Sequence, residues 1–295
     1  MAQDWEDTFN AWSKPPGQTE KDRCANAESA IRNAIKASDK LKKRNVEVFT
    51  QGSYRNNTNV KKESDVDVAI VCYDTFLYQL PEGSTREDFK ISPADYSYST
   101  FKNEVGEALV AYFGSSAVSR GNKAFNIKEN SYHVEADAAP FFEHKRYNKD
   151  GSHISGVQLE PDNGGSVINW PEQHYENGVN KNDQTSRNFK AAVRILKSLA
   201  IDMEDNNIVA AKQIPGFLIE CLVWNVPNNS FNYNTYKQIM RACLAHLFNN
   251  TRKDEECSEW GEVSELKYLF KGMHKWTREQ VHSFISSAWD YAGFE

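Results

Sequence analysis

The fold is decided by the stretch Ser64-Asp65-Val66-Asp67-Val68-Ala69-Ile70-Val71, in which acidic and apolar residues alternate before the run becomes apolar. Side chains alternate between the two faces of a β-strand, so Asp65 and Asp67 share one face and the valines share the other. The apolar face suits a protein core. The two carboxylates on the other face are close enough to share a hard divalent cation. The stretch therefore predicts a core strand that also carries metal ligands.

A second stretch, Gln51-Gly52-Ser53-Tyr54, comes before this strand and follows a strand-like run over residues 46–49. Glycine lets the backbone approach a phosphate group closely, and serine adds a hydroxyl and an amide donor. Paired aspartates after such a turn are suited to holding Mg²⁺ against a triphosphate. The alternative is an edge strand with two solvated aspartates. The Gly-Ser pair ahead of an alternating acidic strand favours a nucleotidyltransferase layout.

The third metal carboxylate is expected in residues 132–137, Tyr-His-Val-Glu-Ala-Asp, which also alternate. Val134 and Ala136 would face the core, and Glu135 and Asp137 would face the other side. Asp137 is the preferred ligand because the strand is expected to end at Pro140, shortly after it. Glu135 is the competing candidate, and a solvated acid on an edge strand is its other interpretation.

The composition limits the partners of the chain. Its 295 residues, 39% hydrophobic and 12% aromatic, are enough for one large or two ordinary domains. The net charge of −6 argues against a long, sequence-independent nucleic-acid interface, but small nucleotides remain compatible with it. The five cysteines are scattered without CxxC spacing, the N-terminus is acidic, and no apolar run would span a bilayer. We therefore expect a cytoplasmic protein without a membrane partner.

The character of the sequence changes to helical after the Trp170-Pro171 pair, which predicts two domains, residues 1–170 and 171–295. In the helix expected from residue 188, Lys190, Arg194 and Lys197 are spaced to lie along one side. Lys197 is expected to contact phosphate. For Lys190 and Arg194 a solvated basic face remains the alternative, and Arg194 is kept as a candidate nucleotide contact.

Together the Gly-Ser element and the acidic strands resemble the DNA-polymerase-β-like nucleotidyltransferases. The helical half looks like the bacterial CD-NTases, which are similar to cyclic GMP-AMP synthase and oligoadenylate synthase, and is most similar to their clade E, which includes cyclic UMP-AMP and cyclic dipyrimidine synthases. The likeness is carried by residues 174–182 (HYENGVNKN), 189–197 (FKAAVRILK) and 214–224 (IPGFLIECLVW), and it extends from about Thr19 to the C-terminus. It implies a two-lobed α/β fold, with a polymerase-β-like mixed sheet and helices in one lobe and a C-terminal helical, oligoadenylate-synthase-like lobe.

The resemblance also implies a role for each motif. Asp65, Asp67 and Asp137 would form a metal triad for two Mg²⁺ ions, for which Mn²⁺ can substitute. Phe217 would stack on the base of the donor nucleotide, and Gly216 stands before it where the family usually has serine, so that purine products stay open beside pyrimidine ones. The nucleotide-binding set would consist of Gln51, Gly52, Ser53, Arg194, Lys197 and Phe217.

The implied reaction is attack of a ribose hydroxyl on the α-phosphorus of a second nucleotide, with loss of pyrophosphate, followed by an equivalent step that closes a cyclic dinucleotide. UTP and ATP would be the substrates, with GTP or CTP as further candidates. Pyrimidine products such as cyclic UMP-AMP or di-UMP are favoured, with c-di-GMP or c-di-AMP as alternatives. The product would act on a downstream effector in antiphage (CBASS) signalling, with no long nucleic acid required. The alternatives are a template-independent RNA-chain nucleotidyltransferase, an antibiotic-type nucleotidyltransferase and a catalytically silent nucleotide-binding module.

Overall fold

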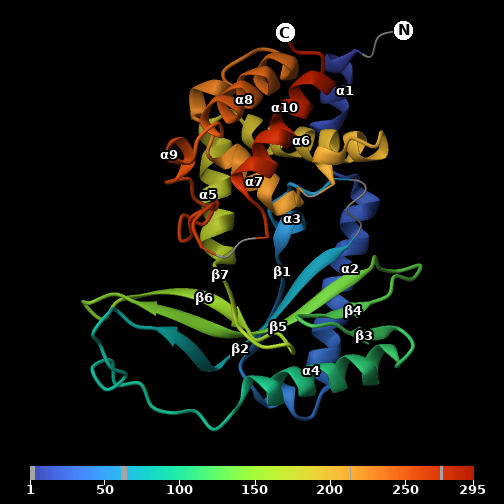
Figure 1. Ribbon diagram of the computed structural model, residues 1–295. Helices are drawn as coiled ribbons and strands as arrows, with labels where there is room; N and C mark the ends of the chain where they lie inside the picture. The colour runs from blue at the N-terminus through green and yellow to red at the C-terminus, as the bar shows by residue number, and fades with distance from the viewer. Residues whose placement is uncertain (1–3, 61–64, 213, 273–274) are drawn as a thin grey trace. The chain divides into compact units, whose positions relative to one another are not determined.

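A computed structural model describes residues 4–60, 65–212, 214–272 and 275–295 of the chain (Figure 1). Its backbone contacts divide into two units. The sheet unit comprises Gly17–Tyr54 and Ser64–Pro171. The helical unit comprises Met1–Pro16, Arg55–Glu63 and Glu172–Glu295.

These units differ from the expected division into residues 1–170 and 171–295, because two early segments belong to the helical unit. The first contains helix α1 (Trp5–Trp12), whose N-terminus is capped by the Asp4 carboxylate. Phe9 of α1 is fully buried in the core of the helical unit, and α1 packs on helices further along the chain. Burial of an aromatic side chain contributes several kcal/mol, about 1.5–3 by transfer measures, which explains why this short helix joins distant partners.

The sheet unit is built on one mixed sheet, in the order β1-β2-β5-β4-β3, with β6 beside β5 and β7 beside β6. Strands β2 and β5 run parallel, and the other neighbours run antiparallel. The strands are β1 (Val46–Thr50), β2 (Val66–Gln79), β3 (Val118–Arg120), β4 (Phe125–Ile127), β5 (Ala136–Tyr147), β6 (His153–Leu159) and β7 (Val167–Asn169). The mixed sheet expected from the sequence is therefore present.

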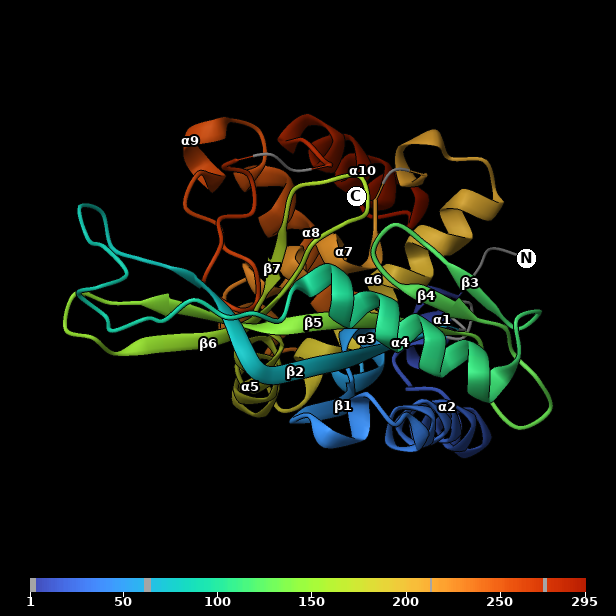
Figure 2. The ribbon, with the colours of Figure 1, turned by 90° about the horizontal axis from the view of Figure 1, so that it is seen from below.

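Two helices, α2 (Gln18–Ala37) and α4 (Tyr98–Phe113), contact each other and the sheet. Figure 2 shows α4 lying across the sheet and α2 beside β1. Ile31 of α2 and Phe101 of α4 are buried in one cluster with the apolar side chains of β2 and β5. Gly114 ends α4 with a φ of +86°, a conformation that glycine adopts without steric cost.

Two strands are longer than the sequence indicated. Strand β5 continues through Pro140 to Tyr147, so the expected end at Pro140 is wrong. Strand β2 continues to Gln79, well beyond the quoted stretch that ends at Val71, after a register shift between Cys72 and Phe76. Proline cannot donate to a neighbouring strand, yet Pro140 stays in register with Ile70 of β2, and its carbonyl accepts a hydrogen bond from the Tyr98 hydroxyl at 2.8 Å. The pairing of the two strands therefore continues past the proline.

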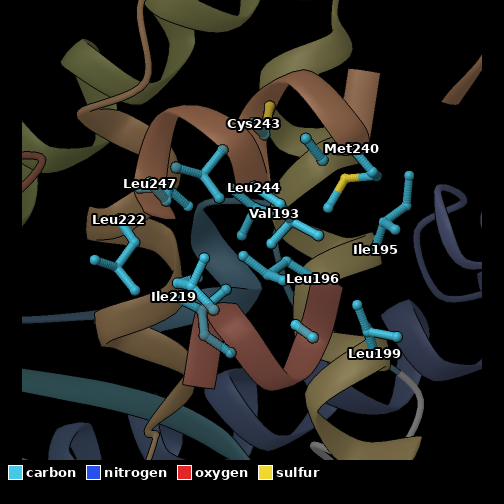
Figure 3. Close-up of a cluster of buried hydrophobic side chains, with 14 of the residues drawn as sticks. Val193, Ile195, Leu196, Leu199, Ile219, Leu222, Met240, Cys243, Leu244 and Leu247 are labelled. Carbon is cyan, nitrogen blue, oxygen red and sulfur yellow. The ribbon is translucent and has the colours of Figure 1, made fainter. Parts of the chain in front are cut away.

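The helical unit packs around α6 (Asn188–Asp205), most of whose residues are buried. Figure 3 shows apolar side chains of α6, α7 and α8 meeting in this core. The predicted capping box at Thr277 and Gln280 is present and begins the last helix. The other helices are α5 (Pro171–Gln184), α7 (Gly216–Trp224), α8 (Tyr236–Asn250), α9 (Asp254–Cys257) and α10 (Arg278–Tyr291), with α3 (Gly52–Arg55) earlier in the chain.

Candidate active site

The parallel pairing of β2 and β5 places two of the predicted aspartates side by side. Asp67 and Asp137 are direct partners in the register of these strands. Asp65 immediately precedes β2, and the amide of the next residue, Val66, donates to the carbonyl of Glu135 at 3.0 Å. Asp65 and Asp67 are exposed, and Asp137 is partly buried. The backbone thus brings the three predicted carboxylates to one end of two neighbouring strands.

An asparagine from the adjacent strand completes this group. Asn126 of β4 is the register partner of Asp137. Its side-chain amide donates to Glu135 Oε1 at 2.5 Å and to Asp137 Oδ1 at 3.4 Å. Asn126 therefore bridges the two competing acids, with a short hydrogen bond to Glu135 and a long one to Asp137. Sequence analysis missed Asn126, because a short strand of three residues gives no signal for which acid its middle side chain contacts.

The electrostatics of this group suit a cation. Burial raises the pKa of Asp137 above its usual value, and the negative charges of Asp65 and Glu135 raise it further, while the hydrogen bond from Asn126 acts in the opposite direction. A divalent cation would relieve this repulsion, and carboxylate oxygens are the ligands that Mg²⁺ prefers. Within the described ranges, no three acidic, histidine or cysteine side chains already converge as a complete metal site. The donor set fits a hard cation.

The Gly-Ser turn lies directly against the second aspartate. The amide of Gln51 donates to the Asp67 carbonyl at 2.8 Å. Gly52 has a φ of +65°, and a Cβ atom there would overlap the Asp67 carboxylate. Ser53 follows in the short helix α3, and the Tyr54 hydroxyl ties the turn to α2 through the Lys21 carbonyl, 2.9 Å away. Glycine is thus required at this position by both conformation and space.

The remaining predicted residues belong to the helical unit and are grouped there. Lys190, Arg194 and Lys197 are all buried, so a solvated basic face is wrong for this side of α6. The Arg194 guanidinium donates to the Ser13 carbonyl at 2.7 Å and to the Asn57 carbonyl at 2.5 Å. These bonds join α6 to both early segments of the helical unit. A direct nucleotide contact by Arg194 stays a prediction.

Phe217, the second residue of α7, remains 42% exposed although most of its helix is buried. Its ring lies 5.9 Å from that of His174 and 6.3 Å from that of Trp276. An exposed aromatic ring held by two others is preorganised for stacking. The same helix contains Glu220, a buried acid in an otherwise apolar run, whose importance the sequence indicated only as an interruption of that run.

Comparison with known proteins agrees with both units. Residues 31–146 match the model of the nucleotidyltransferase domain, and residues 176–293 match that of the cGAS/DncV-like nucleotidyltransferase C-terminal helical domain. The chain is 42% identical to the cyclic dipyrimidine nucleotide synthase CdnE of Cecembia lonarensis over 100% of both chains. It is also 42% identical to the enzyme of the same name from Legionella pneumophila, over 99% of each. The CdnE cyclic dinucleotide synthase of Elizabethkingia meningoseptica, solved with GTP and Apcpp, superposes with a TM-score of 0.83 at 34% identity, covering 99% of this chain and 100% of that one.

A mixed sheet with paired aspartates beside a Gly-Ser turn, joined to a helical domain, defines a nucleotidyltransferase. The chain belongs to the cGAS/DncV-like (CD-NTase) family of these enzymes, as the identity over the full length of its CdnE relatives shows. The fold and family expected from the sequence are confirmed. None of the helices in the described part of the chain combines the length and the apolar character that crossing a membrane needs.

Proposed function

We propose that this protein joins two ribonucleoside triphosphates into a cyclic dinucleotide, in a metal-dependent reaction, and that the product contains at least one pyrimidine. The observation that carries the proposal is the register pairing of Asp67 with Asp137, next to a glycine turn that only glycine can form. The two CdnE relatives at 42% identity are named cyclic dipyrimidine nucleotide synthases, which supports the choice of pyrimidine.

In this proposal Asp65, Asp67 and Asp137 hold two Mg²⁺ ions, for which Mn²⁺ can substitute. The ions supply charge neutralisation at the phosphates and activation of the attacking ribose hydroxyl. Asn126 supports the ionised form of Asp137 through its side-chain amide. The register pairing of Asp67 with Asp137 would place two of these ligands side by side for the ions.

In this proposal the Gly-Ser turn and Lys197 bind the phosphates of the donor nucleotide. Gly52 lets the backbone come close to the β- and γ-phosphates, with Gln51 beside it, and Ser53 donates from its hydroxyl and amide. Lys197 neutralises charge on the leaving pyrophosphate. Phe217 stacks on the donor base, which its exposed ring permits. These assignments rest on the positions that match the family motifs.

The choice of bases is the least constrained part of the proposal. UTP is the favoured substrate, with ATP as its partner and with GTP and CTP as alternatives. The E. meningoseptica structure holds GTP, and Gly216 provides no hydroxyl beside the stacking ring, so a purine product is the competing outcome. We further propose that the enzyme works in the cytoplasm and that its product activates a downstream effector in antiphage signalling.

The test is incubation of the purified protein with Mg²⁺ and all four ribonucleotides, with one labelled at a time. Phosphatase treatment, chromatography and mass spectrometry then identify the products. A small phosphatase-resistant product that is absent with Asp67→Asn but present with Glu135→Gln supports the proposal. Glu135→Gln is a matched control, because it removes a carboxylate two residues from Asp137 that Asn126 already engages.

Other outcomes reject it. Products that lengthen with time and are degraded by ribonuclease would indicate an RNA-chain enzyme. Nucleotide binding without release of pyrophosphate, with Mg²⁺ and with Mn²⁺, would indicate a silent binding module. Phosphatase-resistant products made only from ATP and GTP would retain the cyclase and overturn its pyrimidine preference.

A further inference from the structure

Glu220 is an acid buried in the core of the helical unit. It is 3% exposed and lies in α7 between buried apolar neighbours, including Ile219 and Cys221. A buried charge costs several kcal/mol of desolvation, and apolar residues in its place are often neutral or stabilising. Stability alone therefore gives no reason for a carboxylate at this position.

Both oxygens of Glu220 have specific partners. Oε2 accepts a hydrogen bond from the Thr58 hydroxyl at 2.8 Å, and Oε1 lies 3.0 Å from His174 Nε2. Burial alone would raise the pKa of Glu220. The His174 hydrogen bond and charge, the Lys197 charge and the Thr58 hydroxyl outweigh burial, and the pKa falls below its usual value. Glu220 is therefore ionised, and because a carboxylate only accepts, His174 Nε2 carries the donated proton.

This carboxylate is connected to the proposed base contact of the helical unit. His174 lies between Glu220 and the Phe217 ring, with 5.9 Å between the two ring centroids and 37° between their planes. The positive charge of Lys197 favours the ionised form of Glu220. A buried acid is thus linked through one histidine to an exposed aromatic ring.

The cluster also retains positive charge. Lys190 lies in it as well: burial lowers its pKa, and Glu220 raises it. The charges of Lys190 and Lys197 both interact favourably with the Glu220 carboxylate, so the region carries more positive than negative charge, which suits a polyanion.

We propose that Glu220 is a positioning residue for nucleotide binding: it fixes the Phe217 ring through His174. This inference rests on the proposed function, in which Phe217 contacts the donor nucleotide. It assigns a role to three residues outside the acidic site, Thr58, His174 and Glu220.

A simple charge argument predicts the opposite result, which makes the inference testable. Removing a carboxylate near a triphosphate site should strengthen binding of the anion by Coulomb's law. If Glu220 positions Phe217 through His174, Glu220→Gln should instead weaken binding, by about tenfold. Calorimetric titration of the full chain with an α,β-imido UTP analogue and, separately, an ATP analogue in Mg²⁺ measures this without requiring any product.

The coupling to Phe217 is measured with a double-mutant cycle. We expect Phe217→Leu to weaken binding about tenfold or more, and Glu220→Gln to add nothing in the double variant, since both act through the same ring. Thr58→Val should weaken binding about threefold with less risk to folding. The matched control is Thr251→Val, which removes another buried hydroxyl of the same unit, far from Glu220 in the chain, and should leave affinity unchanged.

Three results would overturn the inference: unchanged or tighter binding by Glu220→Gln and Thr58→Val, fully multiplicative losses in the double variant, or equal losses in Thr251→Val. Loss of analogue binding in the positioning variants, together with no cyclic product from the wild-type protein, would support the role of Glu220 and reject the proposed reaction. The two proposals therefore fail separately.

Discussion

Gly52 lies so close to Asp67 that a Cβ atom on Gly52 would overlap Oδ2 of Asp67 and lie 3.1 Å from its Cγ. The φ of Gly52, +65°, is also one that residues with a side chain rarely adopt. The turn that would approach the phosphates is therefore in direct steric contact with the aspartate that would hold the metal. A change at the turn acts on the metal ligand.

Gly52→Ala should consequently reduce activity far more than stability. We expect product formation to fall at least about 100-fold, because displacing a metal ligand by an ångström has effects of this size. The free energy of unfolding should fall by about 1–3 kcal/mol from backbone strain. Gly151→Ala is the matched control, since Gly151 has a φ of +85° but nothing within 4 Å of its Cβ position. Equal activity loss in both variants would show that strain alone is responsible.

Asp137→Asn should abolish product formation and yet stabilise the metal-free protein at neutral pH. The pKa of Asp137 is raised in the folded state by burial and by Asp65 and Glu135, so ionisation of this group opposes folding. The gain in Tm should therefore be present at pH 7 in EDTA and disappear as the pH falls through the pKa of Asp137, where the wild-type group is neutral too. Mg²⁺ should raise the Tm of the wild type but not of the variant.

Glu135→Gln provides the comparison for Asp137→Asn. It removes a negative charge that raises the pKa of Asp137, and its own carboxylate is already engaged by Asn126. We expect activity within about threefold of wild type, because the loss of a surface interaction costs less than about 1 kcal/mol. If Glu135→Gln abolished activity while Asp137→Asn retained it, Glu135 and not Asp137 would be the third ligand.

Asn126→Ala should move the acid side of the pH–activity profile to higher pH. The Asn126 amide stabilises ionised Asp137 and so lowers its pKa. Without it the pKa rises, and a higher pH is needed to ionise the group that binds metal. At pH 7 we expect about a fivefold loss, as for one hydrogen bond of about 1 kcal/mol, recovered on raising the pH. A loss that persists at every pH would indicate damage to the strand pairing instead.

Arg194→Lys tests whether this residue acts on the nucleotide or on the fold. Lysine retains the charge but cannot reach both the Ser13 and Asn57 carbonyls, which the guanidinium bonds at 2.7 and 2.5 Å. We expect the free energy of unfolding to fall by about 2 kcal/mol, with the KM for nucleotides changed less than about threefold. The control is Arg241→Lys on the exposed side of α8, where stability should not change. A large rise in KM without loss of stability would identify Arg194 as a nucleotide contact.

Local pattern was enough to predict the acidic strands, because alternation fixes which side chains share a face. The pairing of Asp67 with Asp137 needed an assumption that their strands are neighbours. The end expected at Pro140 was wrong, because β5 stays paired with β2 past the proline, and the local sequence does not show that partner.

The rest of the candidate site depends on contacts between distant segments. Periodicity placed Lys190, Arg194 and Lys197 on one side of a helix but could not show that α6 is buried all round. Asn126 contacts Glu135 across a strand pair, and Glu220 meets Thr58 from a segment that precedes it by more than half the chain. Contacts between segments so far apart produce no periodic pattern in the sequence, so the sequence did not predict them.

The helical unit is assembled from the beginning, an early loop and the end of the chain. During synthesis α1 leaves the ribosome first, but α6 and α8, on which it packs, follow the complete sheet unit. Because the ribosome adds about 5–20 residues per second, many seconds pass between the synthesis of α1 and that of its partners. During this time the helices that pack against Trp5 and Phe9 are not yet present. The sheet unit can therefore form while the polypeptide is growing, whereas the helical unit closes only after α8 has been synthesised. A nascent chain that stops before α8 would carry the acidic strands but no closed core in its helical unit.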